Sequence, residues 1–237
     1  MASDAVAIGG DSALAAYFDL GLHIETSAFP LDFCDRLISV AKTFPPVLSG
    51  DFRTVLQPHT REPIFMEALR HSGVTRVMQK ILGGEISGLQ SQFFYGKPGT
   101  PGFQPHQDNR YVNAPSGAFA SAWVALTDVG ASNGGLYIYP GSRQEPLLEV
   151  EEVEAQESML QDNNALRLRC VVPDKYVSQD VQMRKGDAIF FDGNTIHGSY
   201  VNNSNADRFA LLLTYIRRGT PFTAGRYAQR EEVPIDY

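Results

Sequence analysis

The chain of 237 residues has only two cysteines, Cys34 and Cys170, no excess of basic residues and no long apolar run. Two cysteines are too few for a disulfide scaffold and lack the paired spacing of a zinc site, so we expect ordinary thiols. The net charge of -7 argues against nucleic acid and anionic membranes as partners. No apolar stretch approaches the roughly 20 residues that span a bilayer, and no basic segment followed by an apolar one opens the chain. These absences predict a cytoplasmic location.

The apolar content is sufficient for one sizeable core, since 43% of the residues are hydrophobic. We therefore expect a single domain over residues 1–237, with a helical N-terminal part over residues 1–84. Two stretches of this part carry apolar residues at helical spacing, which predicts amphipathic helices packed outside a sheet. The first stretch comprises Cys34, Leu37, Ile38 and Ala41, and the second runs from Phe65 to Leu82 before Gly83 and Gly84.

Short strand-like runs follow from residue 89 to residue 216, with glycine, proline and asparagine turn signals between them. They cover residues 89–95, 119–127, 136–139, 188–191 and 209–216. Many short strands without intervening helices predict a mainly β fold, a double-stranded β-helix (jelly-roll, cupin-like) barrel over residues 89–216 with flanking N-terminal α-helices. Residues 143–181 are acidic, amide-rich and weakly periodic, which indicates a lid-like excursion from the barrel.

A candidate metal motif begins at His106, two residues before Asp108. On an extended backbone both side chains point to the same face, which suits two ligands of one metal ion. His197 follows an apolar strand that would bring it inward as a third ligand. Two imidazoles and one carboxylate leave three positions open on iron(II), as oxygen activation requires. The short His-x-Asp pattern also arises by chance, and the other histidines lack such a partner and are expected to be structural: His23, His59 and His71.

Arg208 opens an apolar strand, at a position that predicts a buried guanidinium. Burial of this cation is costly unless a carboxylate meets it, and the planar guanidinium matches a carboxylate bidentately. That carboxylate belongs either to an internal aspartate or glutamate or to a bound ligand.

Taken together, the segments His106-Gln107-Asp108 and His197-Gly198-Ser199 with Arg208 resemble the phytanoyl-CoA dioxygenase family of iron(II)/2-oxoglutarate oxygenases. The resemblance covers residues 89–216 and extends to further segments in the same order. These are Ala122-Trp123-Val124-Ala125-Leu126, Asn133-Gly134-Gly135-Leu136, Pro140-Gly141-Ser142-Arg143 and residues 185–191. Such an ordered set is far more specific than any single motif.

The resemblance implies that His106, Asp108 and His197 bind iron(II) and that Arg208 pairs with the distal carboxylate of 2-oxoglutarate. The keto acid end of this cosubstrate would chelate the metal, O2 would be the oxidant, and ascorbate would support turnover in vitro. Family members place a tryptophan in the cosubstrate pocket, which corresponds here to Trp123.

Further polar groups are expected near the cosubstrate. Ser199 is expected to add a hydrogen bond, and Gln92 is expected to face the cosubstrate, although Gln90 shares its face of the strand and is an alternative. The residues that flank the first metal motif, with the first arginine of the excursion, are substrate candidates, for which solvated loop positions are the competing explanation. They are Gln104, Asn109, Tyr111, Asn113, Phe119 and Arg143.

The carboxylate of Asp108 occupies the position that halogenating relatives leave open for chloride. The resemblance therefore predicts hydroxylation of a small organic molecule, with release of succinate and CO2. Desaturation, epoxidation and ring formation are alternative outcomes. The expected substrate is amino-acid-like or a secondary metabolite, and the sequence predicts no oligomeric state.

Two other functions use the same residues. One is a cupin-like isomerase or hydrolase in which the three ligands hold zinc or manganese, against which Arg208 and Trp123 argue. The other is a non-catalytic protein that binds 2-oxoglutarate, for which an intact three-ligand site is unnecessary.

Overall fold

The computed structural model describes residues 11–50, 54–153 and 168–236. Its main element is a seven-stranded antiparallel sheet in the order β1-β9-β4-β11-β3-β12, to which β2 adds by pairing with β3. The strands of this sheet are β1 (Leu22–Glu25), β2 (Val55–Leu56), β3 (Ile86–Gly96), β4 (Phe119–Ala125), β9 (Ala188–Asp192), β11 (Arg208–Arg217) and β12 (Val233–Pro234).

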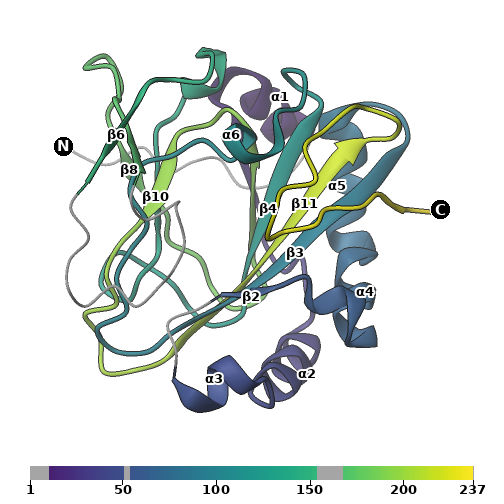
Figure 1. The fold of residues 1–237 in the computed structure, drawn as a ribbon, viewed down its shortest axis with the longest axis vertical. Coiled ribbons are helices and arrows are strands. Elements are labelled where there is room, and N and C mark those ends of the chain that lie inside the picture. Colours follow the sequence, from purple (N-terminus) through teal and green to yellow (C-terminus); the bar gives the residue numbers. More distant parts are fainter. Residues whose placement is uncertain (1–10, 51–53, 154–167, 237) are drawn as a thin grey trace.

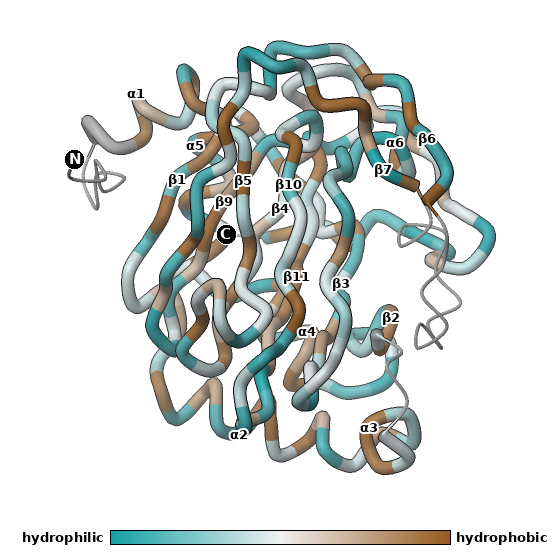
Figure 2. The backbone as a smooth tube through the Cα atoms, turned by 90° about the vertical axis from the view of Figure 1, so that its left-hand side faces the viewer, coloured by the Kyte–Doolittle hydropathy of each residue, from teal (hydrophilic) through white to brown (hydrophobic). Residues whose placement is uncertain are grey.

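A smaller sheet in the order β10-β5-β8 faces the first, and Figure 2 shows β5 and β10 in front of β4 and β11. Its strands are β5 (Leu136–Ile138), β8 (Gln179–Asp180) and β10 (His197–Ser199), and a separate pair consists of β6 (Val150–Glu152) and β7 (Leu168–Cys170). This arrangement confirms the mainly β, jelly-roll prediction. Within the described residues the two sheets do not join into one closed barrel, and only isolated bridges link the loops between them.

Both faces of β11 are buried, which explains why its sequence is almost continuously apolar. Leu211 and Leu213 pack into the core between the large sheet and the helices, whereas Ala210 and Leu212 face the space between the two sheets. Side chains of a strand alternate between its faces. Arg208 and Thr214 therefore share the inner face with Leu212.

Helices cover the outer face of the large sheet, as predicted, and Figure 1 shows α2, α4 and α5 on that side. The helical elements in this part are α1 (Asp11–Leu20), α2 (Leu31–Ala41), α3 (Pro45–Ser49), η1 (Pro58–Thr60), α4 (Pro63–Leu69) and α5 (Ser72–Leu82). In α2 the predicted apolar face is buried at Cys34, Leu37 and Ala41. No helix in the described ranges is long and apolar enough to cross a membrane.

The second helical stretch is divided where the sequence predicted continuous periodicity. The break falls between α4 and α5, because the ring of His71 accepts a hydrogen bond from the backbone N–H of Gly73 and caps the second helix. The other two histidines expected to be structural are also hydrogen-bonded, His23 to Glu25 at 3.0 Å and His59 to Ser91 at 2.6 Å.

Residues 1–84 are not purely helical, which corrects the prediction for this part. β1 lies within it and pairs with β9, placing Leu22 opposite Phe191. A four-residue strand is too short to show a periodic pattern, so its partner determines its conformation. In the excursion over residues 143–181 the structure shows η2 (Ser142–Gln144), β6, β7 and β8, and residues 154–167 lie outside the described residues. Its function as a lid stays a prediction.

Candidate metal centre

The two histidines of the predicted site lie on neighbouring backbones. His197 begins β10, and the isolated stretch at His106 pairs with it, with N···O distances of 2.9 Å from His106 to His197 and 3.1 Å in the reverse direction. Backbone hydrogen bonds thus bring together two segments that are distant in the sequence. Asp108 follows just before α6 (Asn109–Val112).

The imidazoles are oriented through their Nδ1 atoms. His106 Nδ1 lies 2.7 Å from the carbonyl oxygen of Gln104, and His197 Nδ1 lies 3.1 Å from that of Thr195. A carbonyl only accepts, so Nδ1 carries the hydrogen and Nε2 presents its lone pair. The two Nε2 atoms are 3.5 and 3.7 Å from Oδ1 of Asp108, and one ligand atom from each residue lies within 4.8 Å of the others. This is the donor set that a divalent metal ion requires.

The carboxylate of Asp108 is fixed and ionised. Ser121 on β4 donates a hydrogen bond of 2.8 Å to its Oδ2, leaving Oδ1 toward the histidines. Burial by itself would raise the pKa of Asp108, but His197, His106 and Ser121 outweigh it and hold this pKa well below its usual range. Burial and the nearby His106 lower the pKa of His197 to about 4. At neutral pH the site therefore offers a carboxylate and a neutral imidazole, the forms that bind metal.

Arg208 is a buried cation without a counter-charge in the part of the chain that the structure describes. Its side chain is 5% exposed, its Nε has no hydrogen-bond partner, and its guanidinium lies 5.9 Å from the ring of Trp123. Burial lowers its pKa to about 10. Of the two partners expected for this arginine, the internal acid is not found among the described residues, and the ligand carboxylate stays a prediction.

Two glycines make room for this guanidinium. A Cβ atom at Gly134 would lie 3.1 Å from Nη2 of Arg208, and one at Gly96 would lie 3.4 Å from it. Gly134 also has a φ of +84°, which other residues rarely adopt. The Asn-Gly-Gly turn of the sequence is thus part of the arginine's pocket.

A cavity of about 480 Å³ joins the metal-binding residues to Arg208. Along the inner face of β11 it is lined by Arg208, Leu212 and Thr214. Thr214 lies six positions after Arg208 along the strand, which is a span of roughly 20 Å. Thr214 pairs with Ser121, the residue that holds Asp108. The metal ligands therefore lie toward the Thr214 end, and Arg208 marks the opposite end.

All four residues expected near the cosubstrate line this cavity. Ser199 Oγ accepts a hydrogen bond of 2.9 Å from the backbone of Phe103. The amides of Gln90 and Gln92 are joined, with Gln90 Nε2 donating to Gln92 Oε1 at 3.2 Å, so both face the cavity instead of one substituting for the other. Trp123 lies beside Arg208.

The substrate candidates divide into two groups. Tyr111 and Phe119 line the cavity, whereas the other four do not. The carbonyl of Gln104 orients His106, and the amide of Asn109 is bound to Ala114 and Asn194. The amide of Asn109 is therefore engaged within the framework, and neither Gln104 nor Asn109 lines the cavity.

The remaining two candidates also point elsewhere. Asn113 is exposed, with a φ of 53° at the end of α6. Arg143 donates to the carbonyl of Phe18 at 2.7 Å and pairs with Asp192 at 3.3 Å, which ties the excursion to α1 and β9. Both Nη atoms of Arg143 are thus engaged within the protein, and the residue does not line the cavity.

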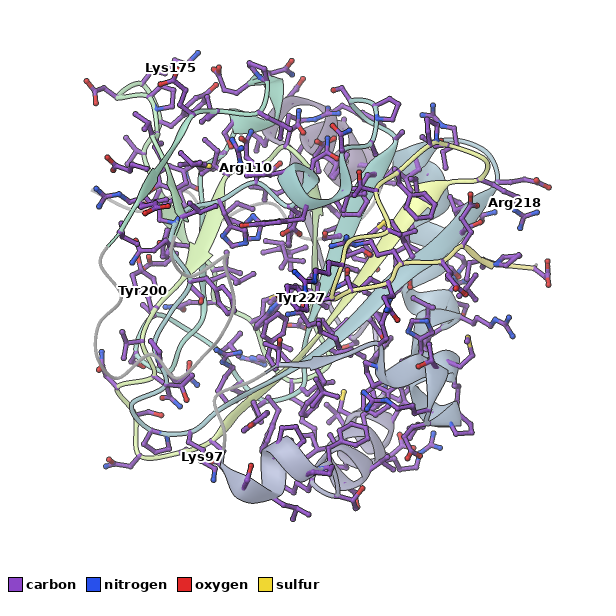
Figure 3. All side chains as sticks on the ribbon, in the orientation of Figure 1. Lys97, Arg110, Lys175, Tyr200, Arg218 and Tyr227 are labelled. Atoms are coloured by element: carbon purple, nitrogen blue, oxygen red, sulfur yellow. The ribbon has the colours of Figure 1, made fainter. Side chains whose placement is uncertain are left out.

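The structure adds a part of the cavity wall that the sequence did not indicate. Residues 225–228 and Arg230, which follow β11, line the cavity together with Thr54 and Leu56. Figure 3 shows Tyr227 near the centre of the view, and this residue is 74% exposed. The segment has no periodic pattern, and its only signal is a glycine followed by arginines and a tyrosine.

Comparison with known proteins agrees with the fold and the site. The family model described as Phytanoyl-CoA dioxygenase (PhyH) matches residues 46–210. Phytanoyl-CoA dioxygenase 1 from rice (Oryza sativa subsp. japonica) is 26% identical over 180 residues, covering 74% of this chain and 61% of its own. The chain spans between about half and three fifths of the length of the first curated relatives it matches.

Solved structures share the architecture. EctD from S. alaskensis, solved with 2-oxoglutarate and 5-hydroxyectoine, superposes with a TM-score of 0.71 at 20% identity, covering 99% of this chain and 87% of its own. The carbocyclase SnoK from nogalamycin biosynthesis, described as non-heme and alpha-ketoglutarate-dependent, gives a TM-score of 0.74 at 18% identity over 92% and 88% of the two chains. Since the family model covers more than half of the sequence and the predicted motifs meet in one cavity, the chain belongs to the phytanoyl-CoA dioxygenase family.

Proposed function

We propose that this protein is an iron(II)- and 2-oxoglutarate-dependent dioxygenase that oxidises a small organic molecule. The observation that carries the proposal is a three-ligand metal group and an uncompensated buried arginine in one cavity. A metal site alone would equally suit an isomerase or hydrolase. The unpaired guanidinium of Arg208 also requires a negatively charged partner, which the second carboxylate of a dicarboxylate provides.

The residues of the cavity fit both iron(II) and 2-oxoglutarate. His106 and His197 would bind iron through Nε2, and Asp108 through Oδ1. Bound iron(II) would supply oxygen activation coupled to the conversion of 2-oxoglutarate to succinate and CO2. Arg208 would hold the distal carboxylate of the cosubstrate bidentately and fix its position relative to the metal ligands.

The protein's other contribution is to exclude water. The cavity walls beside the metal ligands carry apolar side chains, which limit solvent access to the reacting atoms. They are Phe94, Phe103, Leu136, Phe191 and Leu212. Gln90, Gln92 and Ser199 are polar residues of the same wall and would hydrogen-bond the cosubstrate or the water around it.

Hydroxylation is the reaction that we favour. Asp108 occupies the coordination position that halogenation would need to be empty, and EctD was solved with a hydroxylated compound, 5-hydroxyectoine. The SnoK carbocyclase shows that this architecture also serves ring formation. An amino-acid-like compound or a secondary metabolite suits a cavity of about 480 Å³, a modest size for a small-molecule site.

The test is formation of succinate from 2-oxoglutarate by the purified protein with iron(II), ascorbate and air, with a separate binding titration of 2-oxoglutarate under nitrogen. Asp108→Ala should abolish turnover, whereas Asp174→Ala, at an exposed aspartate, should leave it unchanged. Absence of 2-oxoglutarate binding by the wild type would overturn the proposal. Metal-dependent turnover of a substrate without 2-oxoglutarate would instead establish the isomerase or hydrolase.

A further inference from the structure

The wall opposite Arg208 contains a second arginine with an unusual hydrogen-bond pattern. Arg230 donates from Nη1 to three backbone carbonyls, those of Tyr111 at 3.0 Å, Thr223 at 3.3 Å and Ala224 at 3.4 Å. Its Nε is buried and has no partner in the part of the chain that the structure describes. The protein therefore anchors the guanidinium through Nη1, while its Nε remains unpaired among the described residues.

The unused edge has the shape of an acid-binding site. Nε and Nη2 form one side of the planar guanidinium, and two parallel N–H donors match the two oxygens of a carboxylate. A guanidinium anchored through Nη1 presents this edge in a fixed direction. Gly225, with a φ of +78°, allows the anchoring, because a Cβ atom there would lie 2.8 Å from Nη1.

Two hydroxyl groups that line the same cavity also lack partners among the described residues. They are the phenol of Tyr111 and Oγ1 of Thr214, whose side chain is 4% exposed. Burial, and to a lesser extent the charge of Asp108, raise the pKa of Tyr111 to about 12, so its hydroxyl remains a donor at neutral pH. Leaving buried polar atoms without partners is costly, and a polar ligand removes this cost.

The charges of the cavity point to the same kind of ligand. Although the protein carries a net charge of -7, the cavity lining contains three arginines, Arg208, Arg226 and Arg230, and one carboxylate, Asp108. With iron(II) and doubly charged 2-oxoglutarate in place, the charges of Asp108 and Arg208 would be balanced. Arg230 would still lack a counter-charge, so an anion is the complementary second ligand.

We propose that Arg230 and Tyr111 form an acid-binding subsite and that the primary substrate is a small carboxylic acid whose carboxylate docks on the Nε–Nη2 edge of Arg230. This inference rests on the proposed function, because it assigns the other end of the cavity to 2-oxoglutarate. The carboxylate fixes the molecule at the Tyr111 and Thr214 end, and the carbon skeleton extends toward the metal ligands along the apolar side chains of Val112 and Phe119. Arg230 is thus a specificity-determining residue.

The experiment uses the full chain loaded with manganese(II) in place of iron, so that binding is measured without turnover. The probes are matched pairs of a small acid and its amide, among them 3-phenylpropionate with 3-phenylpropionamide and cyclohexanecarboxylate with cyclohexanecarboxamide. Each is added in the presence of 2-oxoglutarate, and affinity is read from the shift in melting temperature. The variants are Arg230→Gln, Arg230→Lys and Tyr111→Phe, and Arg76→Gln on the exposed face of α5 is the control for loss of one positive charge.

We expect at least one acid to bind the wild type and the Arg76→Gln control roughly tenfold or more tightly than its amide, as a charge-assisted bidentate pair requires. Arg230→Gln should remove this preference, Arg230→Lys should retain part of it, and Tyr111→Phe should weaken acid binding less than Arg230→Gln. Tyr111→Phe decides the matter if loss of the Nη1 anchors prevents Arg230→Gln from folding. The proposal is overturned if no acid exceeds its amide, if Arg230→Gln folds and keeps the full preference, or if Arg230→Gln does not fold and Tyr111→Phe keeps the full preference.

The experiment distinguishes failure of the acid-binding subsite from failure of the dioxygenase assignment. Titration of 2-oxoglutarate into the same manganese-loaded samples reports on the Arg208 end, and Arg230→Gln should leave this affinity within about twofold. If the wild type binds 2-oxoglutarate but shows no acid preference, the subsite is wrong and the dioxygenase assignment stands. If the wild type does not bind 2-oxoglutarate, the dioxygenase assignment is wrong whatever the acids do.

Discussion

Replacing Arg208 by methionine should stabilise the free protein and weaken its binding of 2-oxoglutarate. The reason is that the buried guanidinium destabilises the free protein and is compensated only when a ligand carboxylate pairs with it. In the free protein, burial lowers the pKa of Arg208 from its usual value to about 10. This shift corresponds to roughly 3 kcal/mol of destabilisation, at about 1.36 kcal/mol for each tenfold change in the protonation equilibrium. Methionine fills a similar volume without a charge, so Arg208→Met should raise the free energy of unfolding by about 1 to 3 kcal/mol.

The sign of the pH dependence follows from the same shift. Since the folded-state pKa lies below the unfolded value, the charged form is the one that folding disfavours. The cost is fully present below about pH 10 and disappears as the pH rises through the ordinary pKa range of an arginine. The stabilisation by methionine is therefore complete at neutral pH.

Binding of 2-oxoglutarate should change in the other direction. Loss of one partner of a buried bidentate pair costs about 3 to 5 kcal/mol, so the dissociation constant should rise by roughly two to four orders of magnitude. Chemical denaturation of the free protein and calorimetric titration of 2-oxoglutarate into manganese-loaded protein measure the two effects. Arg76→Met, at an exposed position, serves as the control. A variant that is less stable than the wild type, or that binds 2-oxoglutarate within tenfold of it, would refute the reasoning.

Three further predictions concern the surroundings of the site. Ser121→Ala removes the hydrogen bond that holds Oδ2 of Asp108, so we expect metal affinity to fall about 10- to 100-fold in a competition assay with a fluorescent chelator. Gly134→Ala forces a side chain onto a φ of +84° and against Arg208, and should lower both the melting temperature and the affinity for 2-oxoglutarate. Burial raises the pKa of Cys34 to about 11, so a thiol reagent at pH 8 should label this residue only after unfolding.

For each of these three predictions, one outcome would contradict the reasoning. Unchanged metal affinity in Ser121→Ala, with Ser116→Ala at an exposed position as the control, would mean that the serine does not orient the carboxylate. A Gly134→Ala variant that melts and binds like the wild type would show that the turn can relax. Rapid labelling of Cys34 in native protein would contradict its burial.

The parts of the site that the sequence predicted are those whose positions follow from short-range geometry. His106 and Asp108 share a face because their spacing is two, and Arg208 was recognisable because a charge at the start of an apolar strand is unusual. The strands that carry Leu212 and Trp123 were predicted from their apolar runs. Their pairing, which creates the cavity, came from the family resemblance and the structure.

What the sequence did not predict depends on contacts between distant segments. β1 is extended because β9 offers it a partner, and the second helical stretch is divided because His71 caps a new helix. Arg143 looked available for substrate, but the carboxylate that engages it, Asp192, is 49 residues away. Arg230 could not be predicted for the same reason, since its guanidinium is fixed by the carbonyl of the distant Tyr111 as well as by those of the nearby Thr223 and Ala224.

The backbone pairing of His106 with His197 should keep the metal-free protein folded around its empty site. Both imidazoles are attached to strands that are already joined by backbone hydrogen bonds of 2.9 and 3.1 Å. Little chain entropy remains to be lost when an ion arrives, in contrast to small zinc domains that are unfolded without their metal. Treatment with EDTA should therefore leave an intact scaffold, and readdition of iron should restore the centre without a refolding step.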